Sequence, residues 1–226
     1  MPVETISLDH AKETLEKMGF NLAAKEPSTR WIDQKSILCG IAKCGKSNLL
    51  AQAGETNFFF RLAPEFTNLK TFGVDCRDFE EVEKNVGRLV QAHQQNMFIW
   101  DTLTFDPGDR LLDFIAEAVS EHYEADSVGD VPHGKGWAAY KQKIRAFVYS
   151  LEALPAHKFF VFHSQTKEFP ETGQEHERNP KTYSKEIVAL SDKTESVFAK
   201  WVDNILHIKT GYVGDKEERV ILTRGN

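Results

Sequence analysis

The sequence has few cysteines, no long apolar run and no excess of positive charge. Its three cysteines among 226 residues show no CxxC spacing, so we predict free thiols rather than a disulfide framework or a zinc site. No apolar run approaches the roughly 20 residues that a membrane-spanning helix requires. The stretch MPVETISLDHAKETLEKMGF lacks the basic start and apolar centre of a secretory signal. These absences predict a cytoplasmic protein without a membrane role.

The charge of the chain limits the kinds of partner that it is expected to bind. The formal net charge of −6 argues against a broadly basic surface of the kind that binds duplex DNA nonspecifically. Local basic loops are compatible with this balance. With 41% apolar and 27% charged residues the composition is that of a globular chain, and the length fits one large domain.

Short apolar runs alternate with helical patterns along the chain, which predicts an α/β fold. The predicted strands are residues 36–39, 57–62, 71–75, 97–100, 158–162, 204–210 and 219–223. The predicted helices are residues 7–18, 46–53, 78–95, 111–123, 137–151 and 197–202. Because most of these strands are apolar throughout, we expect a mostly parallel sheet with helices on both faces. This core would comprise residues 35–226, with residues 1–34 forming a helical or extended segment packed on it.

A glycine-bounded segment, GIAKCGKS at residues 40–47, lies between the apolar run SILC and the helical stretch SNLLAQA. It matches G-x-x-x-x-G-K-[ST], in which backbone N–H groups surround phosphate oxygens, the lysine meets the β- and γ-phosphates and the hydroxyl binds Mg²⁺. A chance match is the alternative, but the strand before the segment and the helix after it are the required context. The predicted contacts to the nucleotide are Gly40, Ile41, Ala42, Lys43, Cys44, Gly45, Lys46, Ser47 and Asn48, and Ser47 is also a predicted Mg²⁺ ligand.

A carboxylate on a neighbouring strand is expected to complete such a site by holding Mg²⁺, directly or through water. Asp101 is the leading candidate because it follows the apolar run Met97–Trp100 and would emerge at the carboxyl edge of the sheet. A cap on the following turn is the alternative role for Asp101. Asp75, which ends a shorter run, is the rival candidate.

Two further residues are candidates for the catalytic part of the site. Glu65 lies three residues beyond the run FFFRL and would orient an attacking water if that strand adjoins the loop strand. A surface glutamate in a turn is the alternative. His163 follows the run FFVF, so its side chain is expected near the γ-phosphate, where it would report the presence of that group. A strand-end histidine satisfied by backbone groups is the alternative.

The order of the segments GIAKCGKS, FIWDTLT, GKGWAAY, FFVFHSQTKE and FAKWVDNILHI resembles that of the RecA-like P-loop ATPases of phages. It is most similar to the group associated with single-strand annealing and recombination, over residues 35–210. The resemblance implies a RecA-like core, Mg-ATP hydrolysis, homo-oligomers in the form of rings or filaments, and single-stranded DNA bound by loops at the sheet edge. It also implies the cytoplasm of a host cell as the location.

Individual residues also match this group. Lys46 and Ser47 match its phosphate-binding loop, Asp101 its second acidic motif and His163 its polar strand end. Glu65 departs from the pattern, because residues 61–64 separate it from the second strand. A basic residue of a neighbouring subunit commonly completes such a site. The possible donors of that kind are Lys209, Arg219 and Arg224.

The resemblance also marks two loops as candidates for DNA contact, since cations meet phosphates and aromatic rings stack on bases. The first loop, residues 126–136, contains His133 and Lys135 and ends beside Trp137. The second loop is residues 166–183. Its cations are Lys167, Arg178 and Lys181, and its acids are Glu168, Glu171, Glu175 and Glu177. A solvated loop without a DNA contact is the alternative for this acidic segment.

Two other functions remain open at this point. The first is a nucleotide-gated assembly or interaction protein with little hydrolysis, which the departure at Glu65 allows. The second is a small-molecule kinase, which the lack of an arginine-rich lid disfavours.

Overall fold

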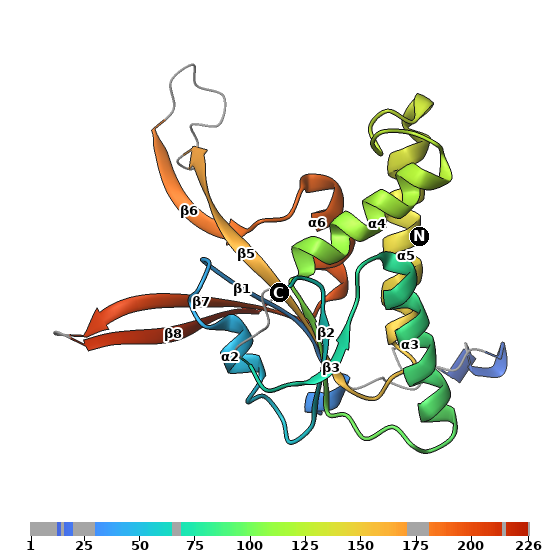
Figure 1. Cartoon of the computed structure of the whole chain (residues 1–226), viewed down its shortest axis with the longest axis horizontal. Helices are drawn as coiled ribbons and strands as arrows, with labels where there is room; N and C mark the ends of the chain where they lie inside the picture. The colour runs from blue at the N-terminus through green and yellow to red at the C-terminus, as the bar shows by residue number, and fades with distance from the viewer. Residues whose placement is uncertain are drawn as a thin grey trace, which may run out of the picture.

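The computed structural model describes residues 13–14, 16–19, 30–64, 69–170, 181–213 and 216–225 (Figure 1). Its strands are β1 (Lys35–Gly40), β2 (Asn57–Arg61), β3 (Phe72–Asp75), β4 (Thr102–Asp106), β5 (His157–Pro170), β6 (Thr182–Val188), β7 (Asn204–Val213) and β8 (Lys216–Gly225). Its helices are α2 (Lys46–Leu50), α3 (Phe79–Gln94), α4 (Gly108–His122), α5 (Lys135–Leu151) and α6 (Asp192–Trp201), with the short 3-10 turns η1 (Trp31–Asp33) and η2 (Pro132–Gly134). Over these ranges no helix combines the length and the apolar character needed to traverse a bilayer.

The strands form one sheet in the order β3-β2-β4-β5-β1-β7-β8, with β6 paired to β5. Every pairing from β3 to β7 is parallel, whereas β8 and β6 pair in the antiparallel direction. The predicted α/β class with a mostly parallel sheet is confirmed. Gly40 pairs with His163, and Arg61 with Asp106, so the ends of β1, β2 and β4 and the middle of β5 lie along one edge. That edge is where open parallel sheets bind ligands.

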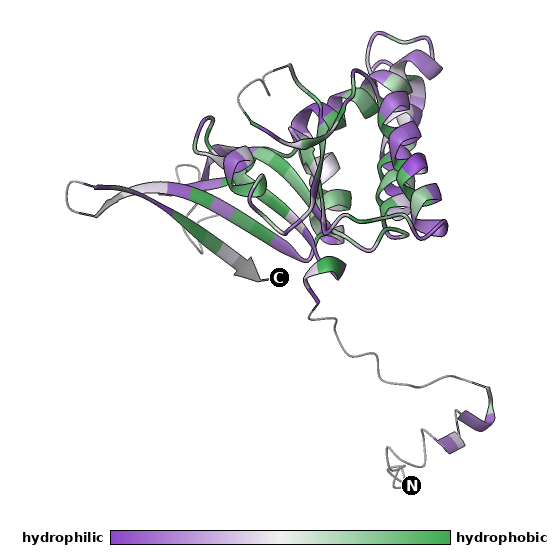
Figure 2. Cartoon of the chain, turned by 60° about the horizontal axis from the view of Figure 1, so that its bottom comes forward, coloured by the Kyte–Doolittle hydropathy of each residue, from purple (hydrophilic) through white to green (hydrophobic). Residues whose placement is uncertain are grey.

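Helices cover the two faces of the sheet unequally (Figure 1). The four long helices α3 to α6 pack over one face, and their buried residues, such as Val82 and Phe198, join the larger hydrophobic core. The short helix α2 lies on the other face, where Leu50 joins Phe59 and Val161 in a smaller cluster. Figure 2 shows the apolar strands of the sheet and the hydrophilic outer faces of the helices. The prediction of helices on both faces is therefore confirmed.

A stack of three phenylalanine rings crosses the larger core from strand to strand. Phe60 of β2 stacks on Phe105 of β4 with ring centroids 4.5 Å apart and planes within 10°. Phe105 stacks on Phe160 of β5 at 4.8 Å and 6°. The three residues are partners in the strand register and point to the same face, and each is fully buried. The stack holds β2, β4 and β5 side by side.

The fourth strand lies later in the sequence than the apolar run Met97–Trp100 predicted. Met97 is 60% exposed, whereas every residue of β4, with the sequence TLTFD, is buried. The two threonines are tolerated inside because each hydroxyl has an acceptor. Thr104 donates to the Asn57 side-chain oxygen at 3.1 Å, and Thr102 donates to a backbone carbonyl at 3.4 Å. Because three of its five residues are polar, β4 lacks the apolar run that predicts a buried strand.

The polar stretch 166–183 was predicted as one long loop, and much of it is strand. β5 continues to Pro170 and β6 begins at Thr182, so the two form an antiparallel hairpin that projects from the sheet (Figure 1). Residues 171–180 lie outside the described residues.

The structure describes only part of the segment 1–34, which was predicted to pack on the core. Residues 13–14 and 16–17 of the predicted helix 7–18 are helical, and the others before residue 18 lie outside the described ranges. Trp31 of η1 packs on β5, with its ring centroid 4.1 Å from that of His157. The packing of residues 1–29 on the core stays a prediction.

Candidate nucleotide-binding site

The segment between β1 and α2 is shaped by its two glycines. A Cβ on Gly40 would lie 2.8 Å from the Ile208 carbonyl oxygen and equally close to the Cys44 sulfur, so a side chain at Gly40 would collide with both. Gly45, directly before α2, has a φ of +97°, in the left-handed region that favours glycine. Backbone geometry therefore requires glycine at both ends of GIAKCG, as the phosphate-binding pattern predicts.

Lys46 begins α2 and is 7% exposed. Its ammonium donates to the carbonyl oxygens of Gly40 at 2.9 Å and Ile41 at 2.8 Å, so the charge is held inside the curve of the loop. An ammonium has three N–H donors. The remaining contact is to the Cys44 sulfur at 4.0 Å, a weak acceptor that a phosphate oxygen would readily replace.

Ser47, the next residue of α2, lies beside a carboxylate at the end of β4. Its hydroxyl donates to Asp106 Oδ2 at 2.5 Å. Asp106 is 4% exposed and ends the buried strand β4 at the carboxyl edge of the sheet. The pair of a loop hydroxyl and a strand-end carboxylate, predicted from the sequence, is therefore present with Asp106 as its acid.

Asp101 is not the residue beside Ser47, and its predicted position is wrong. It precedes the first residue of β4 and so lies at the opposite edge of the sheet from the phosphate-binding loop. Its carboxylate accepts hydrogen bonds from the backbone N–H groups of Glu55 at 3.2 Å and Thr56 at 3.1 Å. Asp101 therefore caps the turn before β2, and not the turn that follows Asp101, which was the alternative role. The rival Asp75 forms a 2.6 Å ion pair with Arg61.

Burial sets the acidity of Asp106. Loss of solvent raises the pKa of its carboxyl to about 6, although the hydrogen bond from Ser47 and the charge of Lys46 act in the opposite direction. A buried carboxylate is costly unless a cation or several donors compensate it. Oxygen ligands from one carboxylate and one hydroxyl, next to a phosphate-binding loop, are those that Mg²⁺ uses in nucleotide sites. Ser47 and Asp106 thus fit the expected metal.

His163 lies across the same site on β5. Its Nδ1 lies 2.7 Å from Asp109 Oδ2, and its backbone N–H donates to the same carboxylate oxygen at 3.1 Å. Asp109 is in the first turn of α4, so this pair ties α4 to β5 beside the loop. The imidazole is 49% exposed, which leaves it able to meet a ligand. The structure thus places His163 at the loop, as expected, and supplies a side-chain partner that the sequence did not predict.

These side chains line one cavity of ≈ 490 Å³. The predicted contact residues that reach it are Ala42, Lys43, Gly45, Lys46, Ser47 and Asn48, together with Asp106 and His163. Gly40, Ile41 and Cys44 do not line it. Their part is to form the loop and to hold Lys46.

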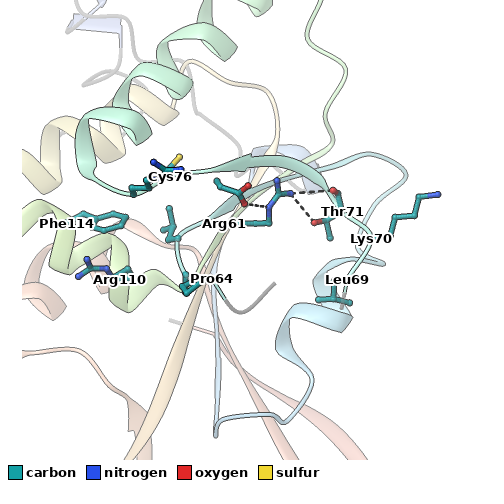
Figure 3. A pocket seen from close by; sticks show the side chains of 12 residues that line it. Arg61, Pro64, Leu69, Lys70, Thr71, Cys76, Arg110 and Phe114 are labelled. Atoms are coloured by element: carbon teal, nitrogen blue, oxygen red, sulfur yellow. Dashed lines mark hydrogen bonds and ion pairs between the residues drawn. The ribbon is translucent and has the colours of Figure 1, made fainter. Parts of the chain in front are cut away.

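A second cavity of ≈ 750 Å³ adjoins the first at the ends of β2 and β3 (Figure 3). Ala63 and Leu69 line both cavities, so these two residues lie at the border between them. Arg61 in its wall is engaged with Asp75, and Arg110 forms a 2.7 Å ion pair with Glu117. Two of its cations are therefore already neutralised within the protein. Glu65 lies outside the described residues, so its predicted role stays untested.

The first predicted DNA loop is far from this site. α4 starts at the site and has 15 residues, which makes it about 22 Å long at 1.5 Å per residue. Residues 126–136 follow the far end of that helix, away from the carboxyl edge of the sheet (Figure 1). The expectation that this loop lies at the sheet edge is therefore wrong. Its His133 and Lys135 fall in η2 and at the start of α5.

The cations proposed as donors to a neighbouring subunit lie on the β7–β8 hairpin. Lys209 is held by Glu186 of β6 through a 3.2 Å ion pair. Arg219 lies against Gly45 of its own chain, 2.8 Å from the place where a Cβ would be. The side chain of Arg224 lies outside the described part of the chain.

Asp106 and Asp109 are the site residues that the sequence interpretation missed. One signal was available for Asp106. It ends the alternating run TLTFD, and Pro107-Gly108 follows directly, which marks the end of a strand. No comparable pattern marks Asp109, because its role depends on how α4 meets β5.

The profile of a family described as an AAA domain matches residues 32–226. The chain belongs to this family. Membership agrees with the phosphate-binding loop and places this AAA domain among P-loop ATPases, for which nucleotide binding is indicated. A crystal structure of a KaiC-like protein from the hyperthermophilic archaeon Pyrococcus horikoshii is similar to it at 10% identity and a TM-score of 0.43, covering 85% of this chain and 79% of that one. A search by sequence against curated proteins gave no match.

Proposed function

We propose that this AAA domain binds and hydrolyses Mg-ATP and couples that turnover to single-stranded DNA, in phage DNA recombination or single-strand annealing. One observation carries the coupling. Strand β5 contributes His163 to the nucleotide cavity and, four residues later, Lys167 to the exposed hairpin with β6. Four residues of strand span about 13 Å. A ligand on the hairpin and a nucleotide in the cavity thus act on the same strand.

The β5–β6 hairpin combines cations and aromatic rings on one face. Lys167 pairs directly with Lys185 in the strand register, and Phe169 pairs with Tyr183. Like charges directly opposite each other destabilise a strand pair, and a phosphate between them would remove that penalty. Both ammonium groups lie near the Phe169 ring, at 5.9 and 5.8 Å from its centroid. Proteins bind single-stranded nucleic acid with cations that contact the phosphates and aromatic rings that stack on the bases.

The aromatic part of this face is accessible. The Phe169 and Tyr183 rings lie 6.0 Å apart and 29° from parallel, and Tyr183 is 49% exposed. Rings held in this way offer platforms for bases whatever the sequence of the strand. Of the two predicted DNA segments, the one that includes this hairpin is therefore the site that we propose. Arg178, the other predicted cation before Lys181, lies outside the described residues.

In the nucleotide cavity, Lys46 would neutralise phosphate charge while the loop backbone binds the phosphate oxygens. Ser47 and Asp106 would hold Mg²⁺, which supplies charge neutralisation to the transferred phosphoryl group. His163, fixed by Asp109, would sense the terminal phosphate. Glu65 is not assigned the role of orienting the attacking water, because β4 and β5 lie between β2 and β1, so the strand before Glu65 does not adjoin the loop strand.

Assembly into a ring or filament is part of the proposal. It rests on the resemblance to RecA-like ATPases and would place single-stranded DNA along successive hairpins. Multiple weak contacts of this kind add up along a bound strand.

The test is the rate of ATP hydrolysis with and without single-stranded DNA at low salt, with particle size measured in the ATP and ADP states. We expect DNA to accelerate turnover and added salt to remove the effect. Lys46→Ala should abolish nucleotide binding or turnover, and normal turnover in that variant would refute the site. ATP binding without turnover in the unmodified protein would favour the nucleotide-gated assembly function. Turnover that single-stranded DNA leaves unchanged would remove the coupling.

A further inference from the structure

Strand β8 forms one edge of the sheet, and its outer side is open. β8 pairs with β7 over its whole length, from Lys216 to Gly225, without a bulge. It ends the strand order, and no strand of the described part of the chain lies beyond it (Figure 1). An open strand edge presents a row of N–H and C=O groups that can pair with another strand. β8 is therefore able to accept a further strand.

The middle of β8 is apolar and exposed on both faces. Val220, Ile221 and Leu222 are 46%, 46% and 47% exposed. Neighbouring residues of a strand point to opposite faces, so equal exposure of all three means that neither face is covered here. Ile208, the partner of Ile221 on β7, is buried, so the exposure begins at the edge strand. Burial of these three side chains against a partner strand would be favourable.

The other open edges of the sheet are protected in ways that β8 is not. β3, at the opposite end of the strand order, has only four residues. β6 has seven residues, and the charged Lys185 and Glu186 stand within it. Short edge strands and charges within an edge strand are common defences against unwanted pairing. β8 has ten residues and no proline, and its charges flank the apolar centre. Its edge is thus suited to a partner strand.

The sequence of β8 complements itself. In a two-fold symmetric antiparallel pair, one residue faces its own copy and the others are matched about it. With Ile221 at the centre, Val220 of each copy would face Leu222 of the other. By its place in the register, Glu218 would then face Arg224, and the symmetry gives this pair of opposite charges twice. A second copy of this chain therefore fits the edge in both its apolar and its charged positions.

The neighbouring two-fold registers are matched less well. A pair centred on Val220 would place Glu218 opposite Leu222. A pair centred on Leu222 would place Arg224 opposite Val220. Both put a charge against an apolar side chain, which loses solvent without gaining a partner. The register centred on Ile221 avoids this.

We propose that β8 pairs in the antiparallel direction with β8 of a second copy, centred on Ile221, so that the two sheets become one. The contact closes after two copies, unlike the head-to-tail contacts that build a ring or a filament. The two-fold axis reverses the strand direction, so the nucleotide cavities of the two copies face opposite ends of the joined sheet. The pairing involves no nucleotide and therefore goes beyond the proposed function.

The first test is the mass of the protein without nucleotide, measured by sedimentation equilibrium over a range of concentrations. We expect a dimer whose share rises with concentration. Ile221→Lys places two ammonium groups opposite each other on the axis, so that variant should stay monomeric. Ile99→Lys makes the same change at another exposed position and should dimerise normally. A monomer at every concentration in the unmodified protein would overturn the proposal, and so would a dimer that Ile221→Lys leaves unchanged.

Charge reversal tests the register without touching the apolar centre, and it decides the question if Ile221→Lys fails to fold. Glu218→Arg puts like charges opposite each other in two symmetric pairs and should weaken dimerisation about tenfold. Arg224→Glu should weaken it in the same way. The double variant restores opposite charges and should regain the original affinity. Absence of that recovery, or single variants that dimerise normally, would refute this pairing.

A disulfide tests the geometry of the pair. The native cysteines are buried and should not react. Ile221→Cys places two thiols opposite each other, with about 5 Å between their Cβ atoms, so mild oxidation should link the copies. Thr223→Cys is the control, because its copy would lie about 13 Å further along the strand, which is too far for a disulfide. Equal linking of the two variants would contradict the proposed register.

Lys46→Ala separates this inference from the proposed function. That variant loses the ammonium of the phosphate-binding loop and keeps β8, so it should lose turnover and still dimerise. Loss of the dimer in Lys46→Ala would overturn a pairing that needs no nucleotide. A normal β8 dimer in an unmodified protein without ATP turnover would support the pairing and refute only the proposed hydrolysis.

Discussion

The hydroxyl of Ser47 donates to the carboxylate of Asp106 at 2.5 Å, joining the start of α2 to the end of β4. Ser47 and Asp106 are 59 residues apart in the chain. They meet because the parallel sheet places the end of β4 near the start of α2. Their contact makes Asp106 the candidate acid of the proposed nucleotide site. It also gives that acid an unusual property, because the same burial that positions Asp106 raises its pKa to about 6.

Replacement of Asp106 by asparagine should reduce activity and increase stability together. Loss of a side chain that supports a bound metal, directly or through its other ligands, typically lowers activity about 10- to 100-fold. We therefore expect Mg²⁺-dependent turnover to fall by that amount. Because the folded pKa is raised from 3.8 to about 6, the stabilising contribution of Asp106 is complete below pH 4 and is lost as the pH rises through 6. At pH 7 without Mg²⁺ the variant should therefore unfold at a higher denaturant concentration, with a gain of the order of 3 kcal/mol as an upper bound.

Asp101→Ala is the matched comparison, and it should lower stability without changing activity. Its carboxylate accepts from the N–H groups of Glu55 and Thr56, so its removal should cost about 1–2 kcal/mol of unfolding free energy. Turnover per folded molecule should be unchanged. Loss of Mg²⁺ dependence in Asp101→Ala, with normal dependence in Asp106→Asn, would return the metal role to Asp101.

Removal of the paired lysines Lys167 and Lys185 should weaken single-stranded DNA binding. Each phosphate contact contributes about −0.7 to the slope of log affinity against log salt for single strands, so the double alanine variant should have a slope that is shallower by about 1.4. Nucleotide affinity should not change, because the loop is untouched. Thr166→Ala with Ser184→Ala removes polar groups from the opposite face of the same ribbon and is the control. An equal effect of the two double variants would argue against this face as the DNA site.

His157 should make the fold sensitive to acid. Burial lowers its pKa to about 4, and the ring stacks on Phe159 at 4.0 Å while Nε2 lies 2.8 Å from the Ser36 hydroxyl. The unfolded chain binds a proton at about pH 6.5, so stability should fall between pH 6.5 and 4, by at most about 3 kcal/mol. Urea unfolding of His157→Gln across that range should show a flatter pH dependence. His133→Gln, at an exposed position, should retain the original slope, and a slope unchanged in His157→Gln would refute this assignment.

The parts of the fold that depend on local sequence were predictable. The loop between SILC and SNLLAQA lies between a strand and a helix because its glycines and its flanking apolar residues specify both. The helix from Phe79 was expected from the acidic stretch DFEEVE, and Asp78 indeed caps it by accepting from the Glu81 N–H at 2.8 Å. These features need no information about distant parts of the chain.

The parts that depend on tertiary contacts were not predictable in the same way. Thr104 is polar by type, and its burial becomes acceptable only through the Asn57 amide on another strand. The sequence therefore predicts the strand at the nearby apolar run Met97–Trp100, with Asp101 at its end. Arg219 was recognised as a candidate cation, but the loop that it meets is set by the register of β7 and β8. The sequence pattern thus predicted a carboxylate beside the loop, but it pointed to Asp101 where the structure has Asp106.

The stacked rings of Phe60, Phe105 and Phe160 have a mechanical consequence. Their centroids lie 4.5 and 4.8 Å apart, close to the spacing of about 4.8 Å between neighbouring strands. Sliding one strand along the next would separate the rings, so the central sheet resists shear as a unit. Under the proposed function, a change at the nucleotide would reach the hairpin with β6 along β5, the strand that carries both His163 and Lys167.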